Sequence, residues 1–228
     1  MHSGNRRRVV VTGLGILSSI GNDQQEVLAS LRSNRSGIVA MPEWKDLGFR
    51  SQVAGTIKSI NNEEVRKDLG SKGRFMDVAS LWSVLAAQQA VDDSGLTSEL
   101  LAGDKVACIA GSGFSSAMSF INAADCVAGR VKRSAPYDVT RSMASSVSAN
   151  IANFYGLKGR SYSIASACAT SMHNIGHAAE LIRSGECDIA LSGGAEEINE
   201  VITCMFEGMR VVLSKSYNET PQSASRPY

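Results

Sequence analysis

The sequence predicts an α/β fold with a mostly parallel, mixed sheet. Four short apolar runs each end in glycine or other small residues, and helical patterns separate them. Continuous apolar runs of this length are typical of strands buried on both faces, as in parallel sheets. Because strands and helices alternate along the chain, the pattern favours a layered α/β architecture over a helical bundle or an all-β fold.

The N-terminal part predicts a strand, a helix and an irregular region. The run Val9–Val11 leads into glycines and predicts a buried parallel strand. A helix should follow, with Asn22 or Asp23 as its N-cap. Residues 33–73 are polar and punctuated by Gly, Asn and Pro, so they predict an irregular cap built of short elements.

The remaining chain alternates between helical and strand patterns. Its helices place apolar side chains at i, i+3 and i+4, and two of them end at a glycine suited to a left-handed cap. The predicted elements are a helix over 75–94 ending at Gly95, a strand over 104–113, a helix over 138–155, a strand over 161–168, a helix over 168–184 ending at Gly185, and a strand over 187–197.

Composition excludes several classes of protein. The 228 residues are 43% hydrophobic and 20% charged, and the net charge is +1. A general binder of nucleic acid or of a membrane surface should be more basic. No stretch approaches the about 18 apolar residues of a membrane-spanning helix. The first residues have charges but no apolar core after them, so we expect no secretion signal.

The cysteines point to a reducing compartment. There are five of them, widely spaced and without a C-x-x-C pair, which fits neither a disulfide framework nor a zinc site. We therefore expect a cytoplasmic protein. The five residues are Cys108, Cys126, Cys168, Cys187 and Cys204.

The densest chemical signal is the segment SIASACATS at residues 163–171. A predicted strand ends in small residues, Cys168 follows, and a helix begins directly after it. The unpaired N–H groups and dipole of a helix N-terminus favour an anion, so this position favours a nucleophilic thiolate. The backbone N–H of Cys168 could also help to hold an oxyanion. The alternative is a buried structural cysteine.

Several segments resemble one family. The chain is similar to the β-ketoacyl-acyl-carrier-protein synthases of type I/II, condensing enzymes of the thiolase-like class, over nearly its whole length. The most specific part is the A-C-A-T-S segment with the G-G-A-E strand behind it. The segments that carry the resemblance are RRVVVTGLGILSSIGN, the GSG turn at 111–113, SIASACATSMHNIGHAAELIRSGECDIALSGGAEE and SASRPY.

The resemblance implies a fold and an activity. Residues 1–228 would be the N-terminal half of a thiolase-like α-β-α-β-α sandwich, and the SYSIASAC strand would lie at the interface of a homodimer. Cys168 would accept an acyl chain from acyl-carrier protein, and malonyl-carrier protein would then condense with it after losing CO₂. The pathway would be fatty-acid synthesis, and the resemblance implies no metal or organic cofactor. A polyketide-type ketosynthase is the alternative enzyme.

The family also uses two histidines and a lysine from later motifs, and this chain does not contain those motifs. A truncated fragment that cannot condense on its own is therefore a third possibility. His173 and His177 follow Cys168 in the same predicted helix, poorly aimed at the thiol, and we interpret them as helix-packing or surface residues. The paired carboxylates Glu196 and Glu197 are interpreted as structural, bound to backbone or to a basic partner.

The resemblance also suggests residues for substrate and partner. Phe114 would face the acyl tunnel and shorten it, unless it packs in the core, and Met143 and Phe206 would line the same tunnel. Basic residues would receive the acidic carrier protein, although an ordinary solvated surface explains them equally well. These basic residues are Lys72, Arg74, Arg130, Lys132 and Arg133.

One motif suggests a different class of protein. GLGILSS at residues 13–19 resembles the turn of a dinucleotide-binding site. Ser18 stands where the third glycine belongs, and no acidic residue ends a second strand about 20 residues on. We therefore expect these glycines to serve a tight turn between the first strand and the first helix.

Overall fold

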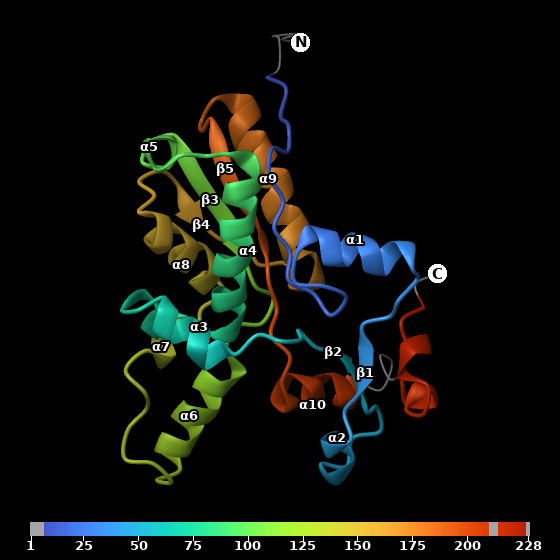
Figure 1. Cartoon of the computed structure of the whole chain (residues 1–228). Helices are drawn as coiled ribbons and strands as arrows, with labels where there is room; N and C mark the ends of the chain where they lie inside the picture. Colours follow the sequence, from blue (N-terminus) through green and yellow to red (C-terminus); the bar gives the residue numbers. More distant parts are fainter. Residues whose placement is uncertain (1–6, 210–213, 227–228) are drawn as a thin grey trace, which may run out of the picture. The chain divides into compact units, whose positions relative to one another are not determined.

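The computed structural model describes residues 7–209 and 214–226, and the chain forms two compact units (Figure 1). The first unit draws on Met1–Gly15 and Asn61–Glu197, and the second on Ile16–Ile60 and Ile198–Tyr228. Residues 1–6, 210–213 and 227–228 lie outside the described part. Within that part, no helix is long and apolar enough to cross a membrane.

The first unit carries a parallel sheet. Its three strands are ordered β4-β3-β5, and both pairings of the central strand are parallel, with Cys108 opposite Ser161 and Val106 opposite Ile189. The strands are β3 (Val106–Gly111), β4 (Ser161–Tyr162) and β5 (Ile189–Gly194). The helices of this unit are α3 (Asn62–Asp68), α4 (Val78–Ser94), α5 (Ser98–Leu101), α6 (Ala117–Val127), α7 (Asp138–Arg141), α8 (Ser146–Tyr155) and α9 (Thr170–Ser184).

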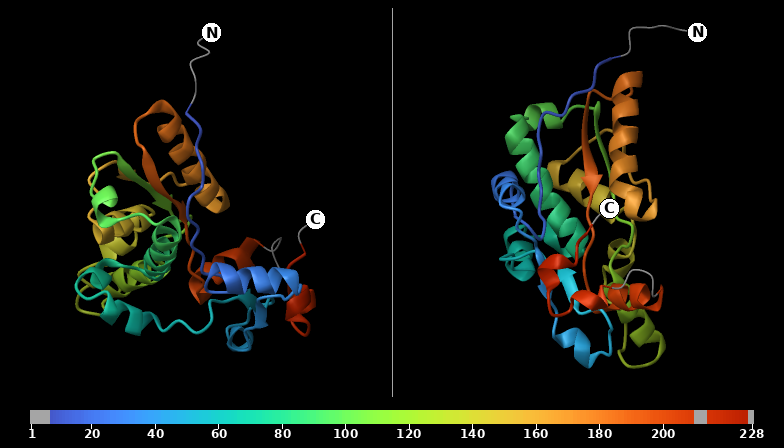
Figure 2. Two further views of the ribbon diagram at one scale, coloured as in Figure 1. Left: turned by 45° about the horizontal axis from the view of Figure 1, so that its top comes forward. Right: turned by 90° about the vertical axis from the view of Figure 1, so that its right-hand side faces the viewer.

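Helices cover both faces of this sheet, and successive side chains of β3 point alternately to the two helical layers. Val106 and Cys108 face a cluster that contains residues of α4 and α8, whereas Ala107 and Ile109 face Ala178 and other residues of α9. All six residues of β3 are buried. Figure 2 shows α4 and α9 on opposite sides of the strands. The predicted α/β fold with a parallel sheet is therefore confirmed.

The caps of α4 and α9 also agree with the sequence. Asp77 begins α4 by accepting a hydrogen bond from the backbone N–H of Ser80 at 2.7 Å. Gly95 ends α4 at φ +68°, and Gly185 ends α9 at φ +81°, in the left-handed region where a Cβ is costly. Phe75 lies before α4, in the 3₁₀ turn η1 (Lys72–Phe75), so the helix begins three residues later than predicted.

The predicted strand at Val9–Val11 is wrong. Residues 7–17 form no strand, and Val10 and Val11 are 69% and 77% exposed. The segment instead follows α4: the N–H of Leu14 donates to the Asp93 carboxylate at 2.9 Å, and a Cβ on Gly13 would lie 2.0 Å from the Ala90 carbonyl oxygen. The glycines of this segment thus permit close approach to a helix, rather than a turn between a strand and a helix.

Two other elements are shorter than predicted. The helix over 138–155 is split into α7 and α8, because the carbonyl of Ala144 lies between them and accepts a hydrogen bond from the N–H of Ser112. The strand over 161–168 ends at Tyr162. Beyond it, the backbone of Ile164 pairs with the side chain of Asn174 instead of with a strand.

The second unit is an arrangement of short elements. The prediction of short elements for 33–73 is confirmed, but residues 61–73 of that region belong to the first unit, where they contain α3 and the start of η1. Its helix α1 (Gln24–Arg32) starts at Asp23, whose carboxylate accepts from the N–H of Glu26 at 2.8 Å. Arg50 and Glu207 form an ion pair at 2.7 Å. The other elements are the antiparallel strands β1 (Ile38–Ala40) and β2 (Val53–Gly55), the helices α2 (Glu43–Asp46) and α10 (Glu200–Met209), and the 3₁₀ turns η3 (Lys215–Tyr217) and η4 (Pro221–Ser223).

Candidate active site

The candidate site lies at the carboxyl edge of the parallel sheet. The segments that follow β3, β4 and β5 meet there, which is the edge where α/β folds bind ligands. The chain after β4 reaches Cys168 through the 3₁₀ turn η2 (Ala167–Ala169), and α9 begins two residues after the thiol. The predicted position of Cys168 at a helix N-terminus is therefore confirmed.

A strained turn presents this thiol. Ala167 has φ +51°, a left-handed conformation that is uncommon for a residue with a side chain. Cys168 is exposed, whereas Cys108 and Cys187 are buried. Burial raises the pKa of the Cys108 thiol to about 12, so that cysteine stays protonated and inert. The alternative that Cys168 is a buried structural residue is contradicted.

Glycines bring the three strand ends close together. A Cβ on Gly113 would lie 2.9 Å from the Ala167 carbonyl oxygen, and a Cβ on Gly194 would lie 2.6 Å from the Gly111 carbonyl oxygen. Both contacts are closer than real Cβ atoms allow to a backbone atom. The glycines after β3 and β5 therefore let the backbone pack against the turn that carries Cys168.

The two glutamates after β5 hold neighbouring backbone. The Glu196 carboxylate accepts hydrogen bonds from the N–H groups of Gly113 and Phe114 and from the hydroxyl of Ser112. Glu197 is buried, and its carboxylate accepts from the N–H of Ala117 at the start of α6. Their interpretation as structural carboxylates bound to backbone is confirmed.

The histidines of α9 make local contacts. His173 Nδ1 lies 2.6 Å from the Ser166 hydroxyl, and His177 Nε2 lies 2.7 Å from the Tyr162 hydroxyl. The second ring nitrogen of His177 faces Glu180 at 3.3 Å. These bonds agree with their interpretation as helix-packing or surface residues.

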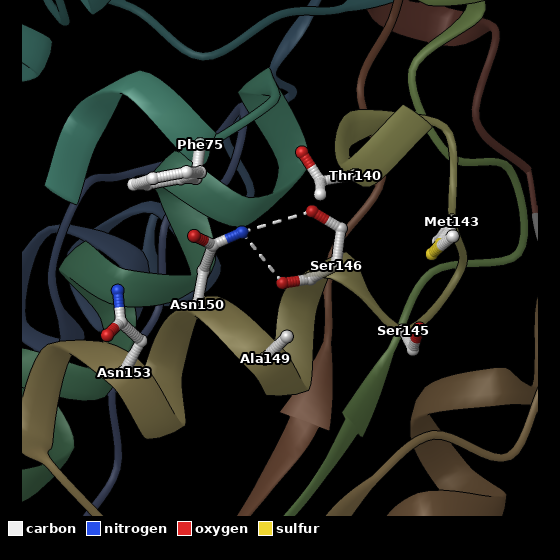
Figure 3. A pocket seen from close by; sticks show the side chains of 8 residues that line it. All are labelled: Phe75, Thr140, Met143, Ser145, Ser146, Ala149, Asn150 and Asn153. Carbon is white, nitrogen blue, oxygen red and sulfur yellow. Dashed lines mark hydrogen bonds between the residues drawn. The ribbon is translucent and has the colours of Figure 1, made fainter. Parts of the chain in front are cut away.

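Two of the three candidate acyl-pocket residues, Met143 and Phe114, have different surroundings in the first unit. Met143 lines a cavity of about 310 Å³ whose walls include Phe75 and the polar side chains of Ser146 and Asn150 (Figure 3). The Asn150 amide donates to both oxygens of Ser146, the carbonyl at 2.9 Å and the hydroxyl at 3.0 Å. Phe114 does not line this cavity and is 39% exposed, so the alternative that it packs in the core is contradicted.

Phe206 belongs to α10 in the second unit, whereas Phe114 and Met143 belong to the first.

The basic residues differ in how they are held. The ammonium group of Lys72 donates to the Phe154 carbonyl at 2.8 Å and lies 5.3 Å from the centre of the Phe154 ring. Arg130 is exposed and pairs with Asp125 at 2.6 Å. Arg74, Lys132 and Arg133 are also exposed.

A ring contact joins the segment of Lys72 and Arg74 to the residues that follow the loop 130–133. Phe75, next to Arg74, meets Tyr137 edge to face at 4.8 Å, and Tyr137 follows the loop that carries residues 130–133. In addition, the guanidinium of Arg141 donates to the Arg74 carbonyl at 2.7 Å. Both contacts join the segment of Lys72 and Arg74 to residues 137–141, which follow the loop that carries Arg130, Lys132 and Arg133.

Sequence reasoning missed two buried residues of α9, Asn174 and Thr170. Asn174 is completely buried and binds the backbone of Ile164, and Thr170 accepts from the N–H of Ser166 at 2.9 Å. The available signal was the presence of polar side chains on the inward face of an otherwise amphipathic helix. Such groups must be hydrogen-bonded, and here their partners are the residues just before Cys168.

The site thus places an exposed thiol on a strained turn between a parallel strand and a helix. Residues 6–228 match the family described as "Beta-ketoacyl synthase, N-terminal domain". The chain belongs to the β-ketoacyl synthase family.

Relatives and solved structures agree with this family. The chain is 46% identical over 224 residues to 3-oxoacyl-[acyl-carrier-protein] synthase 1 of Haemophilus influenzae, an alignment that covers 97% of this chain and 54% of that protein. A β-ketoacyl synthase from Burkholderia phymatum has a TM-score of 0.87 at 25% identity, over 96% of this chain and 53% of the other.

The ishigamide ketosynthase/chain length factor has a TM-score of 0.76 at 30% identity, over 90% of this chain and 51% of that one. These neighbours support the thiolase-like ketosynthase fold. The chain spans about half the length of the curated relatives it matches.

Proposed function

We propose that this chain carries the acyl-accepting part of a 3-oxoacyl-[acyl-carrier-protein] synthase of fatty-acid biosynthesis, with Cys168 as its nucleophile. The observation that carries the proposal is the exposed thiol on the strained Ala167 turn, at the N-terminus of α9. It stands in a chain that is 46% identical to enzymes of that name. Residues 1–228 would form the N-terminal domain of the complete enzyme.

The first half-reaction transfers an acyl group. The thiolate sulfur of Cys168 attacks the carbonyl carbon of an acyl thioester on the carrier protein. A carbon–sulfur bond to Cys168 forms, the bond to the carrier's sulfur breaks, and the departing thiolate takes up a proton. The N–H of Cys168 would stabilise the developing oxyanion, since a helix start leaves such groups without intrahelical partners.

The second half-reaction makes the carbon–carbon bond. Malonyl-carrier protein loses CO₂, and the electron pair of the broken bond becomes a carbanion beside the carrier thioester. The carbanion attacks the acyl group on Cys168, the new carbon–carbon bond forms, and the Cys168 thiolate is restored. The family's resemblance assigns two histidines and a lysine from later motifs to this step. His173 and His177 are engaged with Ser166 and Tyr162 instead.

A polyketide-type ketosynthase is the second candidate. The ishigamide protein supports it at 30% identity, but 46% identity to synthases named for 3-oxoacyl-carrier-protein favours fatty-acid synthesis. A fragment that accepts an acyl chain but cannot condense it is also compatible with a chain that spans about half of its relatives.

The basic residues support docking of an acidic carrier protein. Arg74, Lys132 and Arg133 are exposed, and all of them belong to the first unit. Lys72 and Arg130 would contribute charge to the same surface while bound to Phe154 and Asp125. Complementary charge would act mainly by speeding the encounter.

For the acyl chain, the proposal keeps Phe114, Met143 and Phe206 as lining residues. Exposed Phe114 follows the turn that touches Ala167, so its ring is well placed to limit chain length. Met143 already lines the cavity in Figure 3.

We also propose a homodimer in the cytoplasm. The strand β4 is at one end of the sheet order β4-β3-β5, so its outer edge is available for pairing with a second copy. Sedimentation equilibrium would test this, because a monomer at all concentrations contradicts the proposal.

The decisive experiment measures intact mass after incubation with an acyl-carrier-protein thioester. We expect one acyl adduct on the wild-type chain and none on Cys168→Ala. The control variant Cys204→Ala removes a different exposed cysteine and should keep the adduct. An adduct that survives Cys168→Ala, or that disappears in Cys204→Ala, would refute the assignment.

A further inference from the structure

Asn174 makes an unusual set of contacts for a helical residue. It is completely buried in α9, and its Oδ1 accepts from the N–H of Ile164 at 2.9 Å. Its Nδ2 donates to the carbonyls of Ile164 at 3.0 Å and Thr170 at 2.7 Å. One side chain thus forms hydrogen bonds with both the N–H and the carbonyl of Ile164, as the backbone of a neighbouring strand would.

These bonds replace the sheet at the point where β4 ends. Ile164 comes two residues after the last residue of β4. Without Asn174, its N–H and carbonyl would lose their partners in a half-buried site, which is costly. Thr170 makes a second tie, because its hydroxyl accepts from the N–H of Ser166 at 2.9 Å.

Both ties hold the residues directly before Ala167. A side-chain-bearing residue at φ +51° is strained and persists only when its surroundings over-determine its conformation. Packing on the following side contributes too, since Gly113 lies against the Ala167 carbonyl. The segment 164–166 is therefore fixed to α9 on one side of the strained residue, and Cys168 stands on the other side.

We propose that Asn174 is a positioning residue for Cys168, with Thr170 as its partner. The inference rests on the proposed role of Cys168 as a nucleophile. The buried amide holds the turn in its left-handed conformation, and that conformation keeps the thiol at the N-terminus of α9. Asn174 does not touch substrate. It acts through the backbone of Ile164 and the turn at Ala167.

The test measures alkylation of each cysteine by iodoacetamide in the 228-residue chain, by peptide mass over time. Asn174→Ala should slow labelling of Cys168 about tenfold or more, since small displacements of a reacting group have effects of this order. Cys204 is an exposed internal reference and should keep its rate. Cys108 and Cys187 are buried and report global unfolding, so they should stay protected.

A merely structural role gives a different pattern. If the rate at Cys168 is unchanged in folded Asn174→Ala, or changes only together with exposure of Cys108 and Cys187, the positioning role is overturned. If that variant does not fold, Thr170→Val decides, because it removes only the hydroxyl that Ser166 binds. Thr170→Val should slow the labelling of Cys168, and Thr170→Ser, which keeps a hydroxyl, should retain the wild-type rate. Equal rates in the two Thr170 variants would overturn the proposal.

The proposed function and this inference can fail separately. Failure of the acyl-carrier thioester to modify wild-type Cys168, with iodoacetamide still selective for it and slowed by Asn174→Ala, would reject acyl transfer by this chain and retain the positioning role. No selectivity for Cys168 over Cys204 in the wild type would reject both. An acyl adduct formed equally fast in wild type and Asn174→Ala would reject the positioning role alone.

Discussion

Gly15 lies directly against the Ala86 carbonyl of α4, so that a Cβ on Gly15 would lie 1.7 Å from that oxygen. The contact joins the N-terminal segment to the helix that covers one face of the parallel sheet. It has a direct consequence for substitution, because the clashing atom is backbone and cannot rotate away.

Gly15→Ala is therefore expected to destabilise the chain by about 1–3 kcal/mol, the range found for overpacked sites. Chemical denaturation would measure the loss. Gly176→Ala is a matched control: Gly176 lies within α9 with no atom within 4 Å of its would-be Cβ, so the change should stabilise by about 0.5–1 kcal/mol. Equal effects of the two variants would show that the Gly15 contact is not formed.

Asp77 should make stability depend on pH. Desolvation is the main cause that raises the pKa of this buried carboxyl, against hydrogen bonds from Ser80 and the nearby charges of Arg66 and Arg141. The folded chain therefore holds the proton more tightly than the unfolded chain. This group stabilises the fold below its unfolded pKa, and that contribution is lost as pH rises through the raised folded pKa.

Asp77→Asn keeps a good N-cap for α4 but does not ionise. Urea unfolding between about pH 4 and 7 should show the variant gaining on the wild type as pH rises. Asp23→Asn, at the N-cap of α1, controls for the exchange of a capping residue. Parallel stability curves for wild type and Asp77→Asn would contradict the expectation.

Reversal of exposed charge should slow encounter with the carrier protein. The double variant Lys132→Glu, Arg133→Glu is expected to reduce the association rate about tenfold at low salt, with the difference fading at high salt. Association rates across ionic strength would test the charge reversal, and a deficit that does not depend on salt would argue against electrostatic docking.

Lys72→Ala should instead lower the free energy of unfolding by about 1 kcal/mol, because the ammonium group of Lys72 is bound to Phe154. Chemical denaturation would measure this loss.

Phe114 should influence which acyl chain is accepted. In Phe114→Ala we expect the rate of Cys168 acylation by a long-chain carrier thioester, relative to a short-chain one, to rise about tenfold. Phe120→Ala is the control, since that side chain is also exposed and lies on α6. An unchanged preference, or an equal change in both variants, would remove Phe114 from the acyl tunnel.

The sequence was sufficient wherever local chemistry decides the structure. Apolar runs located β3 and β5, and Asp23, Gly95 and Gly185 marked helix ends because caps satisfy or reverse the backbone locally. The position of Cys168 between a strand and a helix was also predicted in this way, since the strand, the cysteine and the helix follow one another along the sequence.

Contacts distant along the chain could not be predicted. Val9–Val11 is as apolar as β3 but forms no strand, because strand formation also requires a neighbouring backbone. The ties between Asn174 and Ile164 and between Ala144 and Ser112 depend on how elements pack, and no periodicity reports them. The same holds for the hydrogen bond from the Lys72 ammonium group to the Phe154 carbonyl, whose partners are far apart in the sequence.

Because the backbone at Ala167 is left-handed, a substitution that stabilises the fold at this position should lower the reactivity of the thiol that follows it. Glycine would relieve the strain at this position, so a screen that rewards only survival on heating should enrich Ala167→Gly. The gain would come with a looser turn ahead of the thiol, the usual exchange between rigidity and activity at a functional site. In a thermostable descendant that carries this substitution, we therefore expect the Cys168 thiol to react more slowly.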